Sequence, residues 1–136
     1  MPHIDWPHAL KLSLLALVSA LLFTFTTLNP MPWEMVGWVV IYAAWYVALM
    51  RRRPEAPIAQ GIATALLGGA WMVIVLNAFF ATFLQNQPEY QAQYDSMSAA
   101  ARFWNIAGTT FAFSIVLGAI LGLIVRWRMR RTAALS

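Results

Sequence analysis

Four long apolar runs, separated by short polar segments, account for most of the chain. We expect each run to form a helix, at about residues 9–28, 33–50, 61–84 and 103–125. The third run carries no charged residue, and at ~1.5 Å per residue its helix would be ~36 Å long, enough to cross a hydrocarbon core of ~30 Å. The pattern predicts an all-α membrane protein in which residues 1–136 form a single domain of four transmembrane helices.

A shorter segment, about residues 89–101, has a different pattern. Its apolar and aromatic positions, Tyr90, Tyr94, Met97 and Ala101, fall on one face of a helix, and the opposite face is polar. We expect a short amphipathic helix on the membrane surface. Such a helix either binds a partner protein or packs over the mouth of the bundle.

The composition supports a lipid environment, because 61% of the residues are hydrophobic and only 10% are charged, against roughly a quarter in soluble domains. The chain has no cysteine, which excludes thiolate nucleophiles and cysteine metal sites. His3, Asp5 and His8 are the nearest approach to a metal site, but the two histidines would lie on different faces of a helix. We therefore expect no metal and no cofactor.

The net charge is +4, and the basic residues gather at the ends of apolar runs. This placement favours orientation in a membrane over nucleic-acid binding. The two clusters are Arg51, Arg52 and Arg53, and then Arg126, Arg128, Arg130 and Arg131. Because such clusters stay on the cytoplasmic side, we expect two helical hairpins with both termini in the cytoplasm, in a bacterial inner membrane. The same arginines are candidates for contact with anionic lipid headgroups, at about 1 kcal/mol each.

Small residues recur every four positions in two of the runs. The third run carries Gly61, Ala65 and Gly69, and the fourth carries Ser114, Gly118 and Gly122, with Thr110 in the same register. Small residues on one stripe let two helix backbones approach closely in a membrane. The matching stripes predict that the third and fourth runs pack against each other.

Groups that could carry chemistry are scarce. Asn77 is the one strongly polar side chain in the second half of the third run, where it could face a pore or form an interhelical hydrogen bond near 1 kcal/mol. Glu34 falls at the expected start of the second helix, where it complements the positive end of the helix dipole. Without a titratable group inside the runs, we expect neither an enzyme nor a proton-coupled transporter.

From Gly61 to Arg131 the layout resembles a known family. The features are a glycine-marked third helix, the turn Pro88-Glu89-Tyr90, a short polar helix, and a glycine-rich last helix with a basic end. They are similar to those of an uncharacterised bacterial family of small four-helix membrane proteins, known only as a domain of unknown function. The resemblance covers the second half of the chain and implies no activity or site.

Two functions remain open on the sequence. The first is a small integral membrane accessory or structural protein that self-associates or assembles with a larger membrane partner. The alternative is a small transporter or channel subunit that is not coupled to protons. The expected partners are membrane lipids, a second copy of the chain or a larger membrane protein, and not nucleic acid.

Overall fold

The computed structural model describes residues 3–27 and 30–134, and within these residues it contains helices and no strand. The helices are α1 (Trp6–Phe25), α2 (Pro30–Arg52), α3 (Pro57–Ala78), α4 (Phe80–Asn86), the 3-10 helix η1 (Pro88–Tyr90), α5 (Gln91–Tyr94) and α6 (Ala99–Ala134). Four of them, α1, α2, α3 and α6, are long and apolar enough to cross a membrane. The prediction of an all-helical chain with four helices long and apolar enough to span a membrane is therefore confirmed. Leu28, the predicted end of the first helix, lies outside the described residues.

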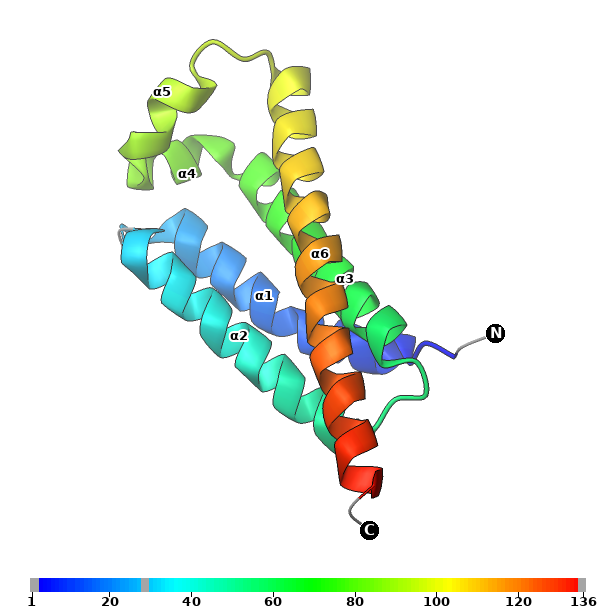
Figure 1. Cartoon of the computed structure of the whole chain (residues 1–136). Coiled ribbons are helices and arrows are strands. Elements are labelled where there is room, and N and C mark those ends of the chain that lie inside the picture. The colour runs from blue at the N-terminus through cyan, green and yellow to red at the C-terminus, as the bar shows by residue number, and fades with distance from the viewer. Residues whose placement is uncertain (1–2, 28–29, 135–136) are drawn as a thin grey trace.

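Helix α3 is the centre of the molecule, with α6 and α1 packed along it (Figure 1). In its most apolar stretch 56% of the residues are buried, against 17% in α2. Because hydrocarbon competes with a helix for apolar contacts, packing in a membrane depends on close fit more than on hydrophobicity. Helix α3, which carries Gly61, Gly68 and Gly69 among its buried residues, is accordingly the one that its neighbours surround.

The third apolar run is bent, in contrast to the single helix predicted over 61–84. Helix α3 ends at Ala78, Phe79 lies between the two helices, and α4 turns across the end of α1 (Figure 1). The bend buries Phe83, which is 3% exposed and lies 5.3 Å from Phe23 of α1 between ring centroids. In a straight helix over 61–84 the last turn would be exposed to lipid. The bend instead packs its aromatic side chains over the end of α1.

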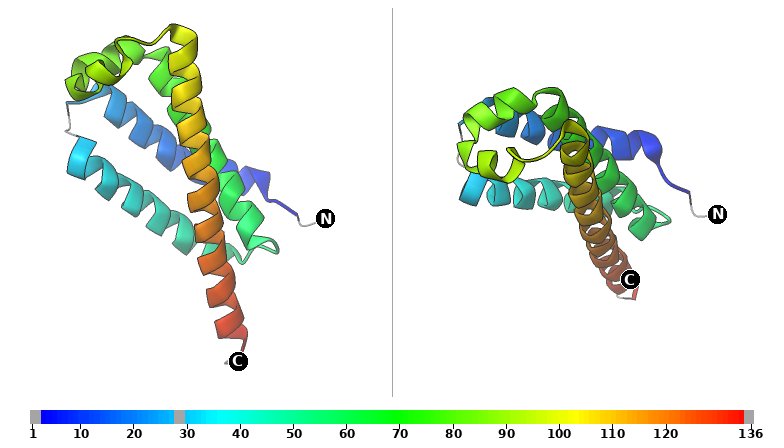
Figure 2. Two further views of the ribbon diagram at one scale, coloured as in Figure 1. Left: turned by 45° about the horizontal axis from the view of Figure 1, so that its top comes forward. Right: turned by 90° about the horizontal axis from the view of Figure 1, so that it is seen from above.

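The predicted surface helix over 89–101 is also divided. It consists of η1 and α5, which end at Tyr94, and α6 begins again at Ala99. The side chain of Ser98 caps α6 by accepting a hydrogen bond of 3.2 Å from the Ala101 N–H. Tyr90 and Tyr94 pack against the core cluster at this end of the bundle, on the face that the sequence predicted. Figure 2 shows α5 beside α4 over this end.

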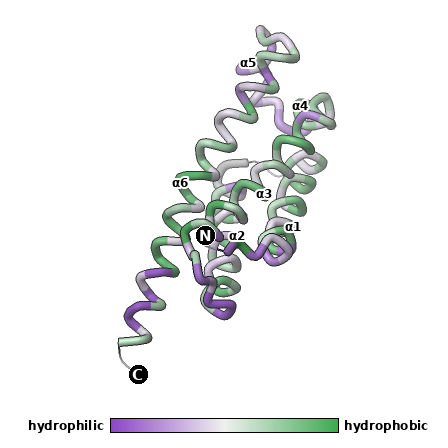
Figure 3. Tube along the Cα trace, turned by 90° about the vertical axis from the view of Figure 1, so that its right-hand side faces the viewer, coloured by the Kyte–Doolittle hydropathy of each residue, from purple (hydrophilic) through white to green (hydrophobic). Residues whose placement is uncertain are grey.

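Helix α6 is longer than the predicted 103–125. Its 36 residues span ~54 Å, well beyond a hydrocarbon core of ~30 Å. Beyond Gly122 the sequence contains no glycine or proline, so nothing interrupts the helix. Figure 3 shows its C-terminal end in hydrophilic colours after a long hydrophobic stretch. The basic residues therefore continue the helix past its apolar part.

A polar cluster joins three helices at the end of the bundle where α1 begins. The side-chain amide of Gln60 forms two hydrogen bonds with the backbone of Asp5. The Asp5 N–H donates to Gln60 Oε1 (2.8 Å), and Gln60 Nε2 donates to the Asp5 carbonyl (3.0 Å). The Asp5 carboxylate pairs with Arg52 at 3.0 Å and caps α1 by accepting from the His8 N–H. Asp5 thus links the start of α1 to the end of α2 and the start of α3.

Two amides close the opposite end of α1. Asn86 Nδ2 donates to the Thr24 carbonyl (2.9 Å), and Gln87 Nε2 donates to the carbonyls of Phe23 and Thr26 (both 3.1 Å). The last carbonyls of a helix have no partner inside it. The residues that follow α3 therefore satisfy the end of α1 and fix the outer turn on it.

Candidate functional site: a cleft between three helices

Helix α2 is attached firmly along its second half only. Trp45 is fully buried there; its indole N–H donates to the Leu12 carbonyl of α1 (2.8 Å), and its ring lies against Gly68 of α3. Toward its N-terminus α2 diverges from α6, and a cleft of about 730 Å³ opens between them, with α3 as its floor. The lining residues are Glu34, Met35, Trp38, Val39 and Tyr42 of α2, Ala65, Gly69 and Met72 of α3, and Thr109, Thr110, Phe113, Ser114 and Leu117 of α6.

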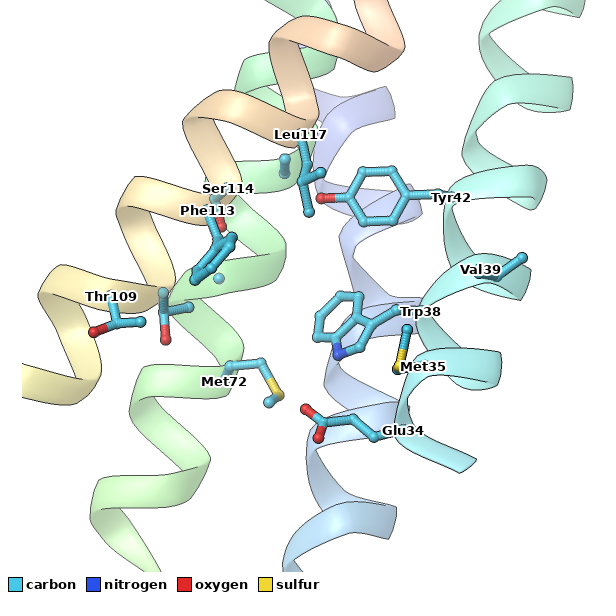
Figure 4. Close-up of a pocket in the computed structure, with 13 residues that line it drawn as sticks. Glu34, Met35, Trp38, Val39, Tyr42, Met72, Thr109, Phe113, Ser114 and Leu117 are labelled. Carbon is cyan, nitrogen blue, oxygen red and sulfur yellow. The ribbon is translucent and has the colours of Figure 1, made fainter. Parts of the chain in front are cut away.

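The walls of the cleft are mainly apolar, and a few polar groups face one another across it. Figure 4 shows the Glu34 carboxylate pointing from α2 into the space opposite Met72. It also shows the Tyr42 hydroxyl directed toward α6 near Leu117. A mainly apolar cavity of this size with a few fixed polar groups has the character of a small-molecule site.

Glu34, Trp38 and Tyr42 form one face of α2, because residues four apart on a helix are neighbours. Figure 4 shows the indole nitrogen of Trp38 on the side of the ring that faces the Glu34 carboxylate. Tyr90 of the outer turn lies close enough for the charge of Glu34 to act on it. Burial is the main cause of the raised pKa of Tyr90, and the nearby negative charge of Glu34 raises it further.

The position of Glu34 corrects the sequence interpretation. The sequence placed it at the first turn of a helix that starts at residue 33, away from the interior. Helix α2 starts at Pro30, so Glu34 lies one turn inside it and lines the cleft. The apolar stretch predicted too short a helix. Helix α2 includes Pro30 and Pro32 because proline is compatible with the first turn of a helix.

The small residues predicted for helix packing are brought together between α3 and α6. A methyl group added to Gly118 would lie 2.8 Å from the Gly61 carbonyl oxygen and 2.9 Å from Ala65 Cβ, and Gly61 also faces Gly122. Further along, Gly69 lies against Ser114. Since Ala65, Gly69 and Ser114 also line the cleft, the packed stripe forms its floor.

Asn77 does not line this cleft. Its side-chain amide donates to the Val73 carbonyl one turn back in α3 (2.8 Å). Because Val73 and Asn77 both belong to α3, this hydrogen bond does not join two helices.

The predicted lipid-contact arginines have different surroundings. Arg52 pairs with Asp5, and the Arg131 guanidinium stacks 3.9 Å from the Trp127 ring centre. Arg53, Arg126 and Arg130 line one groove of about 740 Å³ beside the start of α3. Arg51 lines a separate groove next to Arg52, and Arg128 is exposed on α6.

The described residues contain no group of three or more histidine and carboxylate side chains placed to hold a metal ion. The described residues that line the cleft offer one carboxylate (Glu34), three aromatic rings (Trp38, Tyr42 and Phe113), the hydroxyls of Thr109, Thr110 and Ser114, and apolar walls. Comparisons of the chain with family models, curated proteins and solved structures give no match, and the family resemblance stays a prediction.

Proposed function

We propose that the protein binds a lipophilic molecule in the cleft between α2, α3 and α6. The observation that carries the proposal is the cleft itself, about 730 Å³ in volume and lined mainly by apolar side chains. Binding sites for small molecules are typically ~300–1,000 Å³ and mainly apolar, with a few polar groups that orient the ligand. Ligand binding is compatible with the alternative that the sequence left open, a small transporter or channel subunit.

The proposal does not include the absence of proton coupling. That expectation rested on finding no carboxylate inside the bundle, and Glu34 lines the cleft. The absence of proton coupling therefore stays a prediction, and the test of binding below does not depend on it.

Photolabelling with a neutral aryl diazirine tests the binding proposal. The protein in lipid nanodiscs should be labelled saturably on residues of the cleft, and an excess of an unreactive aryl compound should compete. Leu117→Trp, which places a bulky ring in the cleft, should abolish the saturable component. Leu123→Trp is the matched control, because Leu123 is also exposed on α6 but does not line the cleft.

Two results would contradict the proposal. One is even, non-saturable labelling over all lipid-facing helix surfaces. The other is equal loss of labelling in the two tryptophan variants, which would indicate a general disturbance of α6.

Assembly with a second copy or a larger membrane protein is the second candidate function. The exposed face of α2 favours it, because Val36, Val40 and Val47 are all about half exposed or more and α2 is the least buried of the spanning helices. Ala44→Trp on this face should change the particle mass in mild detergent if α2 forms the contact. An unchanged mass would exclude this face.

We also propose that the helices are arranged as two hairpins with both termini in the cytoplasm of a bacterial inner membrane. Support comes from charge, because Arg51–Arg53 and Arg126–Arg131 both follow the membrane-spanning parts of their helices and lie at the same end of the molecule. The opposite end carries Glu89 and Asp95 on the outer turn. Positive charge on the cytoplasmic side is the general rule for such loops.

A further inference from the structure

We propose that the cleft selects a lipophilic cation, with Glu34 as its counter-charge and Trp38 and Tyr42 as aromatic contacts. The inference rests on the proposed binding function and adds the chemical class of the ligand. Glu34 is the one charged residue among those that line the cleft.

Glu34 has no cationic partner among the described residues. The single ion pair in that part of the chain joins Arg52 to Asp5, and Arg52 ends the same helix four to five turns away from Glu34. A carboxylate near the hydrocarbon region is unfavourable unless it is paired. The neutral indole of Trp38 is the polar group that faces Glu34 on its own helix, so a cationic ligand would supply the charge partner that the described residues do not.

The aromatic rings beside Glu34 suit a cation. The ring centres of Trp38 and Tyr42 are 6.3 Å apart and inclined by 48°, and both side chains line the cleft, with Trp38 between Glu34 and Tyr42 (Figure 4). Tyr42 in turn packs edge to face on the buried Trp45, with 5.0 Å between ring centres. The faces of tryptophan and tyrosine attract cations, most strongly when water is excluded.

The remaining walls exclude a small hydrated ion as the ligand. Met72, Phe113 and Leu117 present apolar surface, and one carboxylate with the hydroxyls of three Thr and Ser side chains falls short of the roughly six to eight oxygen ligands that Ca²⁺ takes. A cation that carries bulky apolar groups satisfies both parts of the site. Its charge lies at Glu34 and its apolar groups lie against α3 and α6.

Equilibrium dialysis with tetraphenylphosphonium tests the inference. The protein in nanodiscs should bind this cation saturably above the level of empty nanodiscs. Tetraphenylborate, with the same four phenyl groups and the opposite charge, should show no saturable binding. Glu34→Gln should weaken tetraphenylphosphonium binding at least about tenfold, and Trp38→Leu should weaken it about threefold. Glu89→Gln is the matched control, because Glu89 is exposed on the outer turn outside the cleft.

A second measurement uses the unmodified chain and so does not depend on the folding of a variant. Tetraphenylphosphonium should protect Glu34 from a hydrophobic carbodiimide, and tetraphenylborate should not. Equal tetraphenylphosphonium affinity of the wild type and Glu34→Gln would overturn the inference, as would unchanged carbodiimide modification. If the neutral diazirine still labels the cleft saturably in that case, the binding function stands and only the charge preference fails. If neither probe saturates, both proposals fail.

Discussion

Gly118 of α6 lies directly against the backbone of Gly61 in α3. A methyl group on Gly118 would come 2.8 Å from the Gly61 carbonyl oxygen and 2.8 Å from the α-carbon of Ile62. Contacts this short require the two helices to separate. The approach of α3 and α6 therefore depends on the absence of a side chain at this position.

Gly118→Ala should destabilise the protein, by roughly 1–3 kcal/mol from overpacking. Gly108→Ala is a matched control on the same helix, because no atom lies within 4 Å of the position that its methyl group would take. In a helix with open space, alanine is more favourable than glycine by roughly 0.5–1 kcal/mol. The melting temperature in detergent should thus fall for the first variant and stay level or rise for the second, and the larger Gly118→Leu change should lower it further. A rise in both alanine variants would show that α6 does not pack closely at Gly118.

The sequence was sufficient for the parts of the fold that depend on local pattern. Length and hydropathy identify four helices, because a helix in hydrocarbon must satisfy its own backbone and must be apolar over ~20 residues. The spacing of Gly61, Gly118 and Gly122 predicted their stripes because helix period alone decides which residues share a face.

The cleft could not be predicted in the same way. It exists because Trp45 fixes the second half of α2 against α1 and α3, while the first half diverges. Which aromatic residue of α2 becomes buried depends on a partner glycine, Gly68, in another helix. Burial of Trp45 fixes how α2 is rotated about its own axis, and this rotation decides which way Glu34 points. Likewise, the bend at Phe79 depends on aromatic contacts with α1 that no local pattern encodes.

Trp45 should be the most sensitive aromatic residue of α2. Trp45→Ala removes a fully buried ring and its hydrogen bond to Leu12. We expect a loss of roughly 3 kcal/mol, at the low end for such changes because hydrocarbon also solvates the separated helices. Trp104→Ala is the control, since Trp104 is 71% exposed on α6. Equal melting temperatures for the two variants would contradict the anchoring of α2 by Trp45.

Gln87→Leu should loosen the end of α1. Gln87 is 1% exposed and donates to two carbonyls there, and leaving buried carbonyls unsatisfied costs roughly 1–3 kcal/mol. Hydrogen exchange should become faster for the amides of the last turn of α1 and of α4. Gln85→Leu, at an exposed position of α4, should leave exchange unchanged. Unaltered exchange in Gln87→Leu would mean that the outer turn is held by its aromatic contacts alone.

Single cysteines test the proposed orientation, because the chain has no native cysteine. Cysteine at Ser96, on the exposed outer turn, should react with an impermeant thiol reagent in intact cells. Cysteine at Ala56 or Ala133 should react only after the cells are opened. Cysteine at Gln85, an exposed position of α4 near the outer turn, should also react in intact cells. Reaction at Ala56 from outside would reverse the orientation.

The stability of the protein should fall in acid through the cluster at Asp5. The hydrogen bond from the backbone N–H of His8 lowers the pKa of the Asp5 carboxyl below its ordinary value of 3.8, and Arg52 lowers it further. The unfolded chain therefore binds a proton at Asp5 more readily than the folded chain does. The stabilisation of the folded chain by the ionised carboxylate is fully present above pH ~4 and is lost as the pH falls through the lower pKa of the folded chain.

Asp5→Asn isolates the charge, since asparagine also caps a helix well. The variant should melt below the wild type near neutral pH, and the difference should shrink and disappear as the pH falls through the pKa of Asp5 in the folded chain, which lies below 3.8. Asp95→Asn, on the exposed turn before α6, serves as the control and should follow the wild-type curve. Arg52→Gln should reproduce only part of the Asp5→Asn effect, because it leaves the His8 hydrogen bond in place. A constant difference between Asp5→Asn and the wild type over this whole range would show that the charge of Asp5 does not stabilise the junction of α1, α2 and α3.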